Sequence, residues 1–153
     1  GRCFEDMATM PLALLRASSY YYAPETWVAY RQRGGRILST MTLPKAFDQS
    51  AALLALRQAL EGRAELGHHG LQFAMAHQCA RNLLGAMRFV RQASAPDAPD
   101  ATEPELAAAA VRIRADFAAA SPLAAEALQQ AYWRRGWWLR WLKFRKGYAY
   151  RSA

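Results

Sequence analysis

Two adjacent acids near the start of the chain, Glu5 and Asp6, are the residues best suited to catalysis. They open an apolar run that predicts a helix, and the free amide groups of a helical first turn stabilise negative charge. A carboxylate held there can accept a proton from a hydroxyl nucleophile at the edge of a cleft. Acids are favoured in first turns whatever the function, however, and on local pattern alone that structural interpretation is the stronger one.

A cluster of arginines, Arg31, Arg33 and Arg36, follows about 25 residues later around a Gly-Gly pair, with Ser39 just beyond. Guanidinium forks, loop amides and hydroxyls are the groups that bind a diphosphate. The competing interpretation is a solvated basic edge strand, because charged side chains on an edge discourage pairing with another chain. Neither the acidic pair nor the arginine cluster indicates a particular function when it is considered alone.

The elements that would position these residues can be predicted from spacing. Residues 5–17 have apolar side chains at helical intervals, so a helix kinked or shortened by Pro11 is expected. The tyrosines at 20–22 and the alternating residues 27–32 predict two short strands, separated by a turn at Pro24. A hydroxyl-rich loop should then run from Arg36 to Leu43.

This order of motifs resembles the C-terminal part of the catalytic domain in family 2 glycosyltransferases, the inverting GT-A enzymes of bacterial polysaccharide and cell-envelope synthesis. The resemblance covers roughly the first forty to sixty residues. It is carried by three segments, Phe4-Glu5-Asp6, Tyr20-Tyr21-Tyr22 and the run from Pro24 to Arg33 followed by Gly35-Arg36-Ile37. Arg36 stands where the family usually has serine, which leaves the hydroxyl contact to Ser39 or Thr40.

The resemblance implies roles for these residues in transfer of a sugar from a nucleotide-sugar donor to a saccharide or lipid-linked acceptor. Asp6 would be the general base on the acceptor hydroxyl, and Glu5 would orient the acceptor or support Asp6. The donor diphosphate would contact Arg31 and Arg33, with Arg36 and Ser39 in the loop that follows. Such enzymes also need a nucleotide-binding half with a divalent metal, Mg or Mn. That half and its Asp-x-Asp motif are missing here, so the chain is expected to be inactive alone.

The rest of the sequence predicts helices. One should begin at Pro44 and end at Gly62, with Leu53, Leu56 and Leu60 on its buried face. A longer helix should run from about Leu66 to Gln92, and residues 94–101 have the composition of a flexible linker. The expected fold is therefore mainly α with a small β element, comprising a GT-A remnant at 1–43 (one helix, two short strands) and a helical bundle at 44–153.

Three further helical signals follow the linker. Thr102 and Glu105 make a capping-box pattern ahead of an apolar stripe that ends at Phe117. Ser121-Pro122 predicts the start of another helix, which should run to about Arg135 and break near Gly136. The last segment places four aromatic side chains on one face, namely Trp137, Trp141, Phe144 and Tyr148. Short connections predict an antiparallel bundle.

The C-terminal segment is strongly basic. The formal net charge is +8, and no acid follows Glu126, whereas seven basic residues do. Trp137, Trp138, Trp141, Arg140 and Lys143 could form a surface for an anionic membrane or a partner. Packing of the tryptophans on the bundle is an equally good interpretation, and nucleic acid is a weaker one. The alternative function is thus a non-enzymatic helical module that binds a membrane or nucleic acid through this segment.

The remaining candidates are weaker. His68, His69 and His77 lack the spacing of a metal site, and Cys79 lies on an apolar stripe typical of a core. Cys3 and Cys79 show no paired spacing, which favours a reducing cytoplasmic location, with peripheral contact to the inner membrane as an extension of it. Without its parent sheet, the first helix would leave an apolar face uncovered, so the chain is expected to form a homodimer.

Overall fold

Helices provide the regular structure throughout the part of the chain that is described. The computed structural model describes Phe4 and residues 6–26, 42–93 and 101–149. Its elements are α1 (Asp6–Arg16), α2 (Leu43–Ala51), α3 (Leu54–Ala59), the 3-10 helix η1 (Ala64–Gly67), α4 (His69–Ala93), α5 (Glu103–Ala120), α6 (Ala125–Arg134) and α7 (Trp138–Tyr148). The predicted mainly α class and the helical bundle are confirmed.

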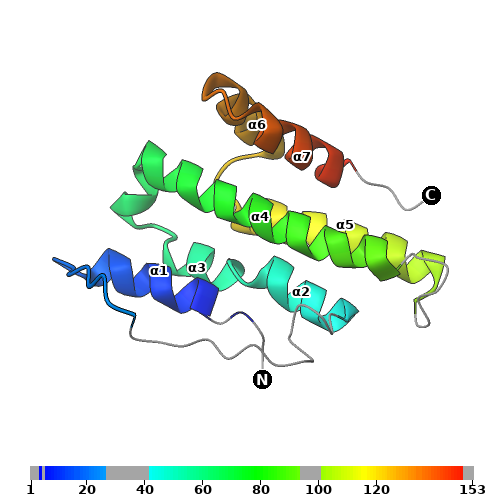
Figure 1. Cartoon of the computed structure of the whole chain (residues 1–153), viewed down its shortest axis with the longest axis horizontal. Coiled ribbons are helices and arrows are strands. Elements are labelled where there is room, and N and C mark those ends of the chain that lie inside the picture. Colours follow the sequence, from blue (N-terminus) through cyan, green and yellow to red (C-terminus); the bar gives the residue numbers. More distant parts are fainter. Residues whose placement is uncertain (1–3, 5, 27–41, 94–100, 150–153) are drawn as a thin grey trace.

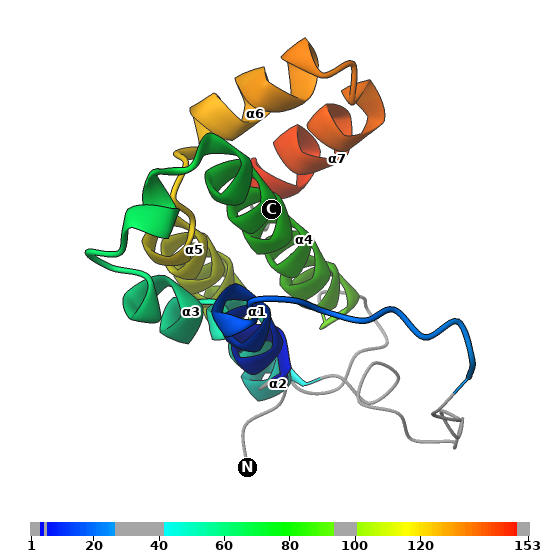
Figure 2. The same cartoon turned by 90° about the vertical axis from the view of Figure 1, so that its left-hand side faces the viewer.

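The helices are arranged in three layers (Figures 1 and 2). The long helices α4 and α5 lie side by side and run in opposite directions in the middle layer. Helices α1, α2 and α3 cover one face of this layer, and the α6–α7 hairpin (residues 125–148) covers the opposite face. The helix expected to carry catalytic residues and the basic aromatic segment are therefore on opposite sides of the bundle.

The predicted small β element is not seen among the described residues. Tyr20, Tyr21 and Tyr22 are not in a strand, and their side chains are 86%, 90% and 77% exposed. Strand propensity reflects packing against a paired and half-buried surface, and an unpaired run of tyrosines has no such surface. The second predicted strand, 27–32, and most of the predicted loop at 36–43 lie outside the described residues.

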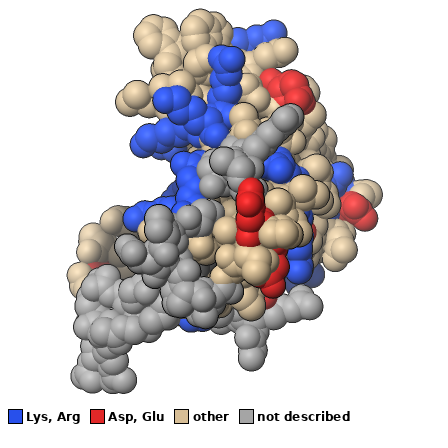
Figure 3. All heavy atoms as spheres, turned by 90° about the vertical axis from the view of Figure 1, so that its right-hand side faces the viewer, with Lys and Arg blue, Asp and Glu red and all other residues tan. Residues whose placement is uncertain are grey.

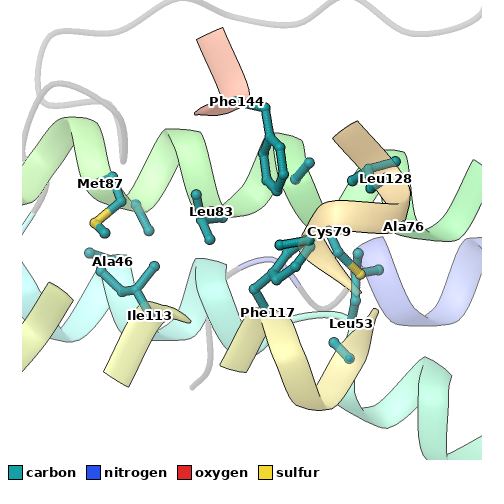
Figure 4. Packing of buried hydrophobic residues seen from close by; sticks show 14 of the residues in the cluster. Ala46, Leu53, Ala76, Cys79, Leu83, Met87, Ile113, Phe117, Leu128 and Phe144 are labelled. Carbon is teal, nitrogen blue, oxygen red and sulfur yellow. The ribbon is translucent and has the colours of Figure 1, made fainter. Parts of the chain in front are cut away.

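One hydrophobic core joins the three layers (Figure 4). Ala46 and Leu53 lie on the α2–α3 side, Cys79, Leu83 and Met87 come from α4, and Ile113 and Phe117 come from α5. Phe144 of α7 points into the same core from the opposite face, and its ring centroid lies 5.5 Å from that of Phe117. Cys79 is 3% exposed, so the prediction of a core cysteine is confirmed.

The helix predicted from Pro44 to Gly62 is in fact two helices, α2 and α3, separated at Ala52 and Leu53. In a continuous helix the Gln49 carbonyl would accept the amide of Leu53. Here it accepts the amide of Ala52 at 3.4 Å and Nδ2 of the buried Asn82 on α4 at 3.1 Å. Helix α3 ends at Ala59, three residues before the predicted end at Gly62, and Gly62 itself has φ of 72°.

Helix α4 begins at His69, three residues later than predicted, because residues 64–67 form η1. Helix α5 starts as the capping box predicts, with the Thr102 amide and hydroxyl both donating to Oε2 of Glu105 at 2.8 Å. The predicted linker at 94–101 lies outside the described residues except for Ala101. Gly147 lets α7 approach α4, since a Cβ there would lie within 2.2 Å of Leu84 Cδ2.

The start of α6 differs from the prediction. The Ser121-Pro122 pattern predicted a helix from that point, whereas α6 begins at Ala125. The hydroxyl of Ser121 donates to the Leu123 carbonyl at 2.6 Å and accepts the Leu123 amide at 3.3 Å. Side chains of this type compete with helical backbone bonds in this way. The predicted break at Gly136 is confirmed, with φ of 68°.

Candidate functional site

Asp6 is the first residue of α1 and its side chain is exposed. It therefore lies where amide groups without intrahelical partners stabilise a carboxylate. Phe4, two residues earlier, has φ of 68°, a left-handed conformation that is rare for an aromatic residue, and its carbonyl accepts the Met7 amide at 3.1 Å. The hydrogen bond from Met7 to Phe4 thus precedes the helical bonds of α1. Glu5 itself lies outside the described residues.

Helix α1 is seated on the bundle by half-buried side chains. Met7, Leu12 and Leu15 pack against the core cluster, although no residue of α1 is fully buried. An apolar pocket of about 270 Å³ remains between α1, α3 and α4, lined by Leu14 and Leu15 on one side and by Leu56 and Met75 on the other. These contacts hold Asp6 in a fixed relation to the helices after residue 42.

The predicted diphosphate site lies outside the described residues. That applies to Arg31, Arg33, Arg36 and Ser39, as it does to Glu5. Of the predicted catalytic and donor-binding residues, only Asp6 is placed.

The predicted membrane or partner residues on the hairpin divide between its two sides. Phe144 is fully buried, Trp141 is half-buried with its ring 5.3 Å from that of Trp133, and Trp137 packs 5.5 Å from the rings of Phe73 and His77. The aromatic stripe that begins at Trp137 therefore attaches the hairpin to α4 and α5. Trp138 lies on the other side, with 62% of its surface exposed.

A hydrogen-bonded cluster joins α4 to the hairpin. Nδ1 of His77 lies 2.7 Å from the Tyr132 hydroxyl, and Nη1 of Arg140 lies 3.1 Å from Nε2 of His77. A guanidinium only donates, so Nε2 must carry the lone pair and Nδ1 carries the proton. Burial, reinforced by the charges of Arg140 and Arg81, lowers the pKa of His77. Burial also raises the pKa of Tyr132 to about 12.

Beside this cluster is a pocket of about 330 Å³ whose polar lining is cationic. We call it the basic pocket, and its charged lining residues are Arg81, Arg140 and Lys143. None of the described residues that line it is acidic. Leu139, which is 76% exposed, stands at the same pocket. An arrangement of convergent cations with a phenol and an imidazole can bind an anion with several oxygen acceptors.

Sequence reasoning missed most of this pocket. Arg140 and Lys143 were predicted as surface residues, whereas Arg81 was not singled out and His77 was considered only as a metal ligand. The spacing of His77 and Arg81 carried a usable signal, because residues four apart lie on one face of a helix. The pairing of this face with Tyr132 and Arg140, more than 50 residues away, had no local signal.

Within the described ranges there is no group of three or more His, Cys, Asp or Glu side chains placed to hold a metal ion. Likewise, none of the helices there has the length and apolar character needed to cross a bilayer. His68 and His69 are exposed, as predicted.

Comparison with protein-family models, curated proteins and solved structures finds no match for this chain.

Proposed function

We propose that this chain is the acceptor-side part of an inverting, nucleotide-sugar-dependent glycosyltransferase, joined to a helical extension. The observation that carries the proposal is the position of Asp6, exposed at the first turn of a helix that packs on the bundle. The motif order around it supports the same class, because Phe4-Glu5-Asp6 precedes the tyrosines and the arginine segment as in family 2 enzymes.

In the proposed reaction, Asp6 takes the proton from an acceptor hydroxyl as that oxygen attacks the anomeric carbon of the donor sugar. The bond to the nucleoside diphosphate breaks in the same step, and Arg31 and Arg33 would stabilise the departing charge. Arg36 and Ser39 would add contacts from the loop, and Glu5 would orient the acceptor. A divalent metal belongs to the nucleotide-binding half of such enzymes and has no ligand set among the residues described here.

The test uses the full-length parent enzyme. Asp6→Asn should lower turnover by about 10²–10⁴-fold, the usual contribution of a general base, while donor affinity stays close to wild type. Turnover is measured from nucleoside diphosphate release, and donor affinity from calorimetric titration. Glu25→Gln is the matched control, because Glu25 is also exposed but does not begin a helix. Wild-type turnover of Asp6→Asn would refute the assignment.

A second candidate function is a non-enzymatic helical module, and one observation favours it. The hairpin presents large exposed apolar side chains next to cations, which a catalytic extension does not require. Measurements on variants of the parent enzyme distinguish the two candidate functions. If Asp6 and the arginine segment can be neutralised without loss of the parent's biological role, the module is the better description.

A further inference from the structure

The outer face of α7 is apolar over its first half. Trp138, Leu139 and Leu142 occupy the side of the helix opposite the buried Phe144 and Gly147, and they are 62%, 76% and 40% exposed. Surface residues of this size are ordinary when they stand singly. Here three of them share one helical face, and the described part of the chain leaves that face exposed. We refer to these three residues as the outer face of α7.

Trp133 extends this surface across the hairpin. It lies on α6, is 57% exposed, and its ring centroid is 6.1 Å from that of Trp138. The turn between the two helices places α6 and α7 side by side (Figure 2), which allows the two indoles to lie close together. Indole rings favour the boundary between water and hydrocarbon, since they combine a large apolar body with one polar N–H group.

Cations border this apolar surface. The hairpin has a single acid, Glu126 in the first turn of α6, and its basic residues are Arg134, Arg135, Arg140, Lys143, Arg145 and Lys146. Figure 3 shows lysine and arginine side chains gathered over the upper part of the molecule, where the hairpin lies. The field at this end of the bundle therefore attracts anions.

The basic pocket adds a defined place for one anionic group. Arg81, Arg140 and Lys143 line it without a carboxylate among the described lining residues, and Leu139 lines the same pocket. Its volume of about 330 Å³ falls at the lower end of the range of ligand pockets. A phosphate there would lie directly beside an exposed leucine, which is the arrangement of a phospholipid headgroup and its acyl region.

We propose that the α6–α7 hairpin docks on the surface of an anionic phospholipid bilayer. Trp138, Leu139 and Leu142 enter the boundary between headgroups and acyl chains, while Arg81, Arg140 and Lys143 hold a headgroup phosphate in the basic pocket. With 11 residues, α7 is too short to cross a bilayer and lies along its surface. The proposal does not depend on the transferase assignment.

The apolar residues favour a bilayer over nucleic acid. Aromatic rings can stack on bases, but Leu139 and Leu142 gain little from such stacking. In contrast, each leucine that leaves water for the acyl region gains free energy in proportion to the apolar area buried. The three-layer arrangement sets the geometry of docking, because α1 lies on the opposite face of the bundle and keeps Asp6 away from the bilayer surface.

The experiment is vesicle co-sedimentation of the 153-residue chain with phosphatidylglycerol–phosphatidylcholine vesicles and with pure phosphatidylcholine vesicles. We expect binding to the anionic vesicles only, weakening as salt is raised. The double variant Leu139→Ser/Leu142→Ser should bind at least about tenfold more weakly, since two leucines no longer leave water. When the phosphatidylcholine of the anionic vesicles is brominated on its acyl chains, these vesicles should quench the tryptophan fluorescence of the wild type.

The basic pocket is tested separately. Arg140→Gln/Lys143→Gln should lose vesicle binding by a similar factor, whereas Arg16→Gln, which removes a cation from α1 on the opposite face, should bind as the wild type does. Val111→Ser is the matched apolar control, because Val111 is 62% exposed on α5. Circular dichroism checks that each variant remains folded.

Three results would overturn the proposal. The first is equal binding to neutral and anionic vesicles. The second is binding of inorganic phosphate in the basic pocket, seen as shifts of the His77 ring resonances, without any binding to vesicles; that would make it a site for free anions. The third is salt-sensitive binding to single-stranded nucleic acid with no binding to lipid.

Discussion

The guanidinium of Arg140 on α7 donates to Nε2 of His77 on α4 across a distance of 3.1 Å. This contact is possible only while the imidazole is neutral, because a protonated ring would offer a second donor instead of a lone pair. The charged and titratable groups around the ring are Arg81 on α4, Tyr132 on α6 and Arg140 and Lys143 on α7. None of these groups carries a negative charge that would stabilise an imidazolium.

The first prediction is therefore that acid weakens the fold through His77. Burial and two arginines lower its pKa in the folded chain, so below the ordinary value of 6.5 the unfolded chain holds more protons. The free energy of unfolding should fall as pH drops from about 6.5 toward the folded pKa. Urea unfolding at a series of pH values measures it. A fall confined to pH below about 4.5 would instead indicate carboxylates.

His77→Gln provides the matched comparison, because the amide oxygen can still accept a hydrogen bond from Arg140 but does not titrate. That variant should show a flatter pH dependence between about 5 and 6.5. An unchanged profile in His77→Gln would contradict the prediction.

The second prediction concerns the two sides of α7. Phe144→Ala should lower the free energy of unfolding by about 3–5 kcal/mol, because its fully buried ring packs against Phe117 and Tyr132 and would leave a cavity. Trp138→Ala should change it by no more than about 0.5 kcal/mol, because most of that side chain is already in water. Chemical denaturation measures both. Similar losses would mean that the outer face also contributes to packing.

Local signals in the sequence were sufficient to predict the positions of most helices. The Thr102–Glu105 capping box placed the start of α5, and Gly136 placed the end of α6. In each case the determining hydrogen bond or backbone angle involves residues within a few positions of one another. Such features depend little on the rest of the fold.

The errors have non-local causes. At the break between α2 and α3, the Gln49 carbonyl accepts a hydrogen bond from Asn82, which is 33 residues away in sequence. The exposed tyrosines at 20–22 have strand propensity but no paired surface. For the candidate site, the sequence predicted that Asp6 lies at the start of a helix. It did not predict the basic pocket, because this pocket requires α4 and α7 to lie side by side.

The third prediction tests the turn between α6 and α7. Gly136 has φ of 68°, and a Cβ there would meet no atom within 4 Å, so only backbone strain opposes substitution. Gly136→Ala should cost about 1–2 kcal/mol of stability. Gly136→Asn should cost less, because asparagine adopts this conformation more readily. Thermal unfolding measures the series.

Gly67→Ala is the control for that series. A Cβ at Gly67 also meets no atom within 4 Å, but the backbone there does not have the left-handed angle. The substitution should therefore be neutral or slightly stabilising. Equal costs at Gly67 and Gly136 would show that strain in the hairpin turn is not the cause.

The last prediction is that the isolated chain self-associates through α1. Met10 and Leu14 are four residues apart on one face and are 59% and 61% exposed, and Leu14 also lines the apolar pocket between α1 and the bundle. A second copy of α1 could cover this face, as the predicted homodimer requires. Met10→Gln/Leu14→Gln should shift the chain to monomer in sedimentation equilibrium.

Leu139→Ser tests whether the chain associates through α1 or through the hairpin. Leu139 is 76% exposed, but it lies on the opposite face of the bundle from α1. If α1 forms the interface, that variant should dimerise as the wild type does. Loss of the dimer in Leu139→Ser with no effect of the α1 variant would place the interface on the hairpin. If the wild-type chain sediments as a monomer at every concentration measured, the homodimer prediction is wrong.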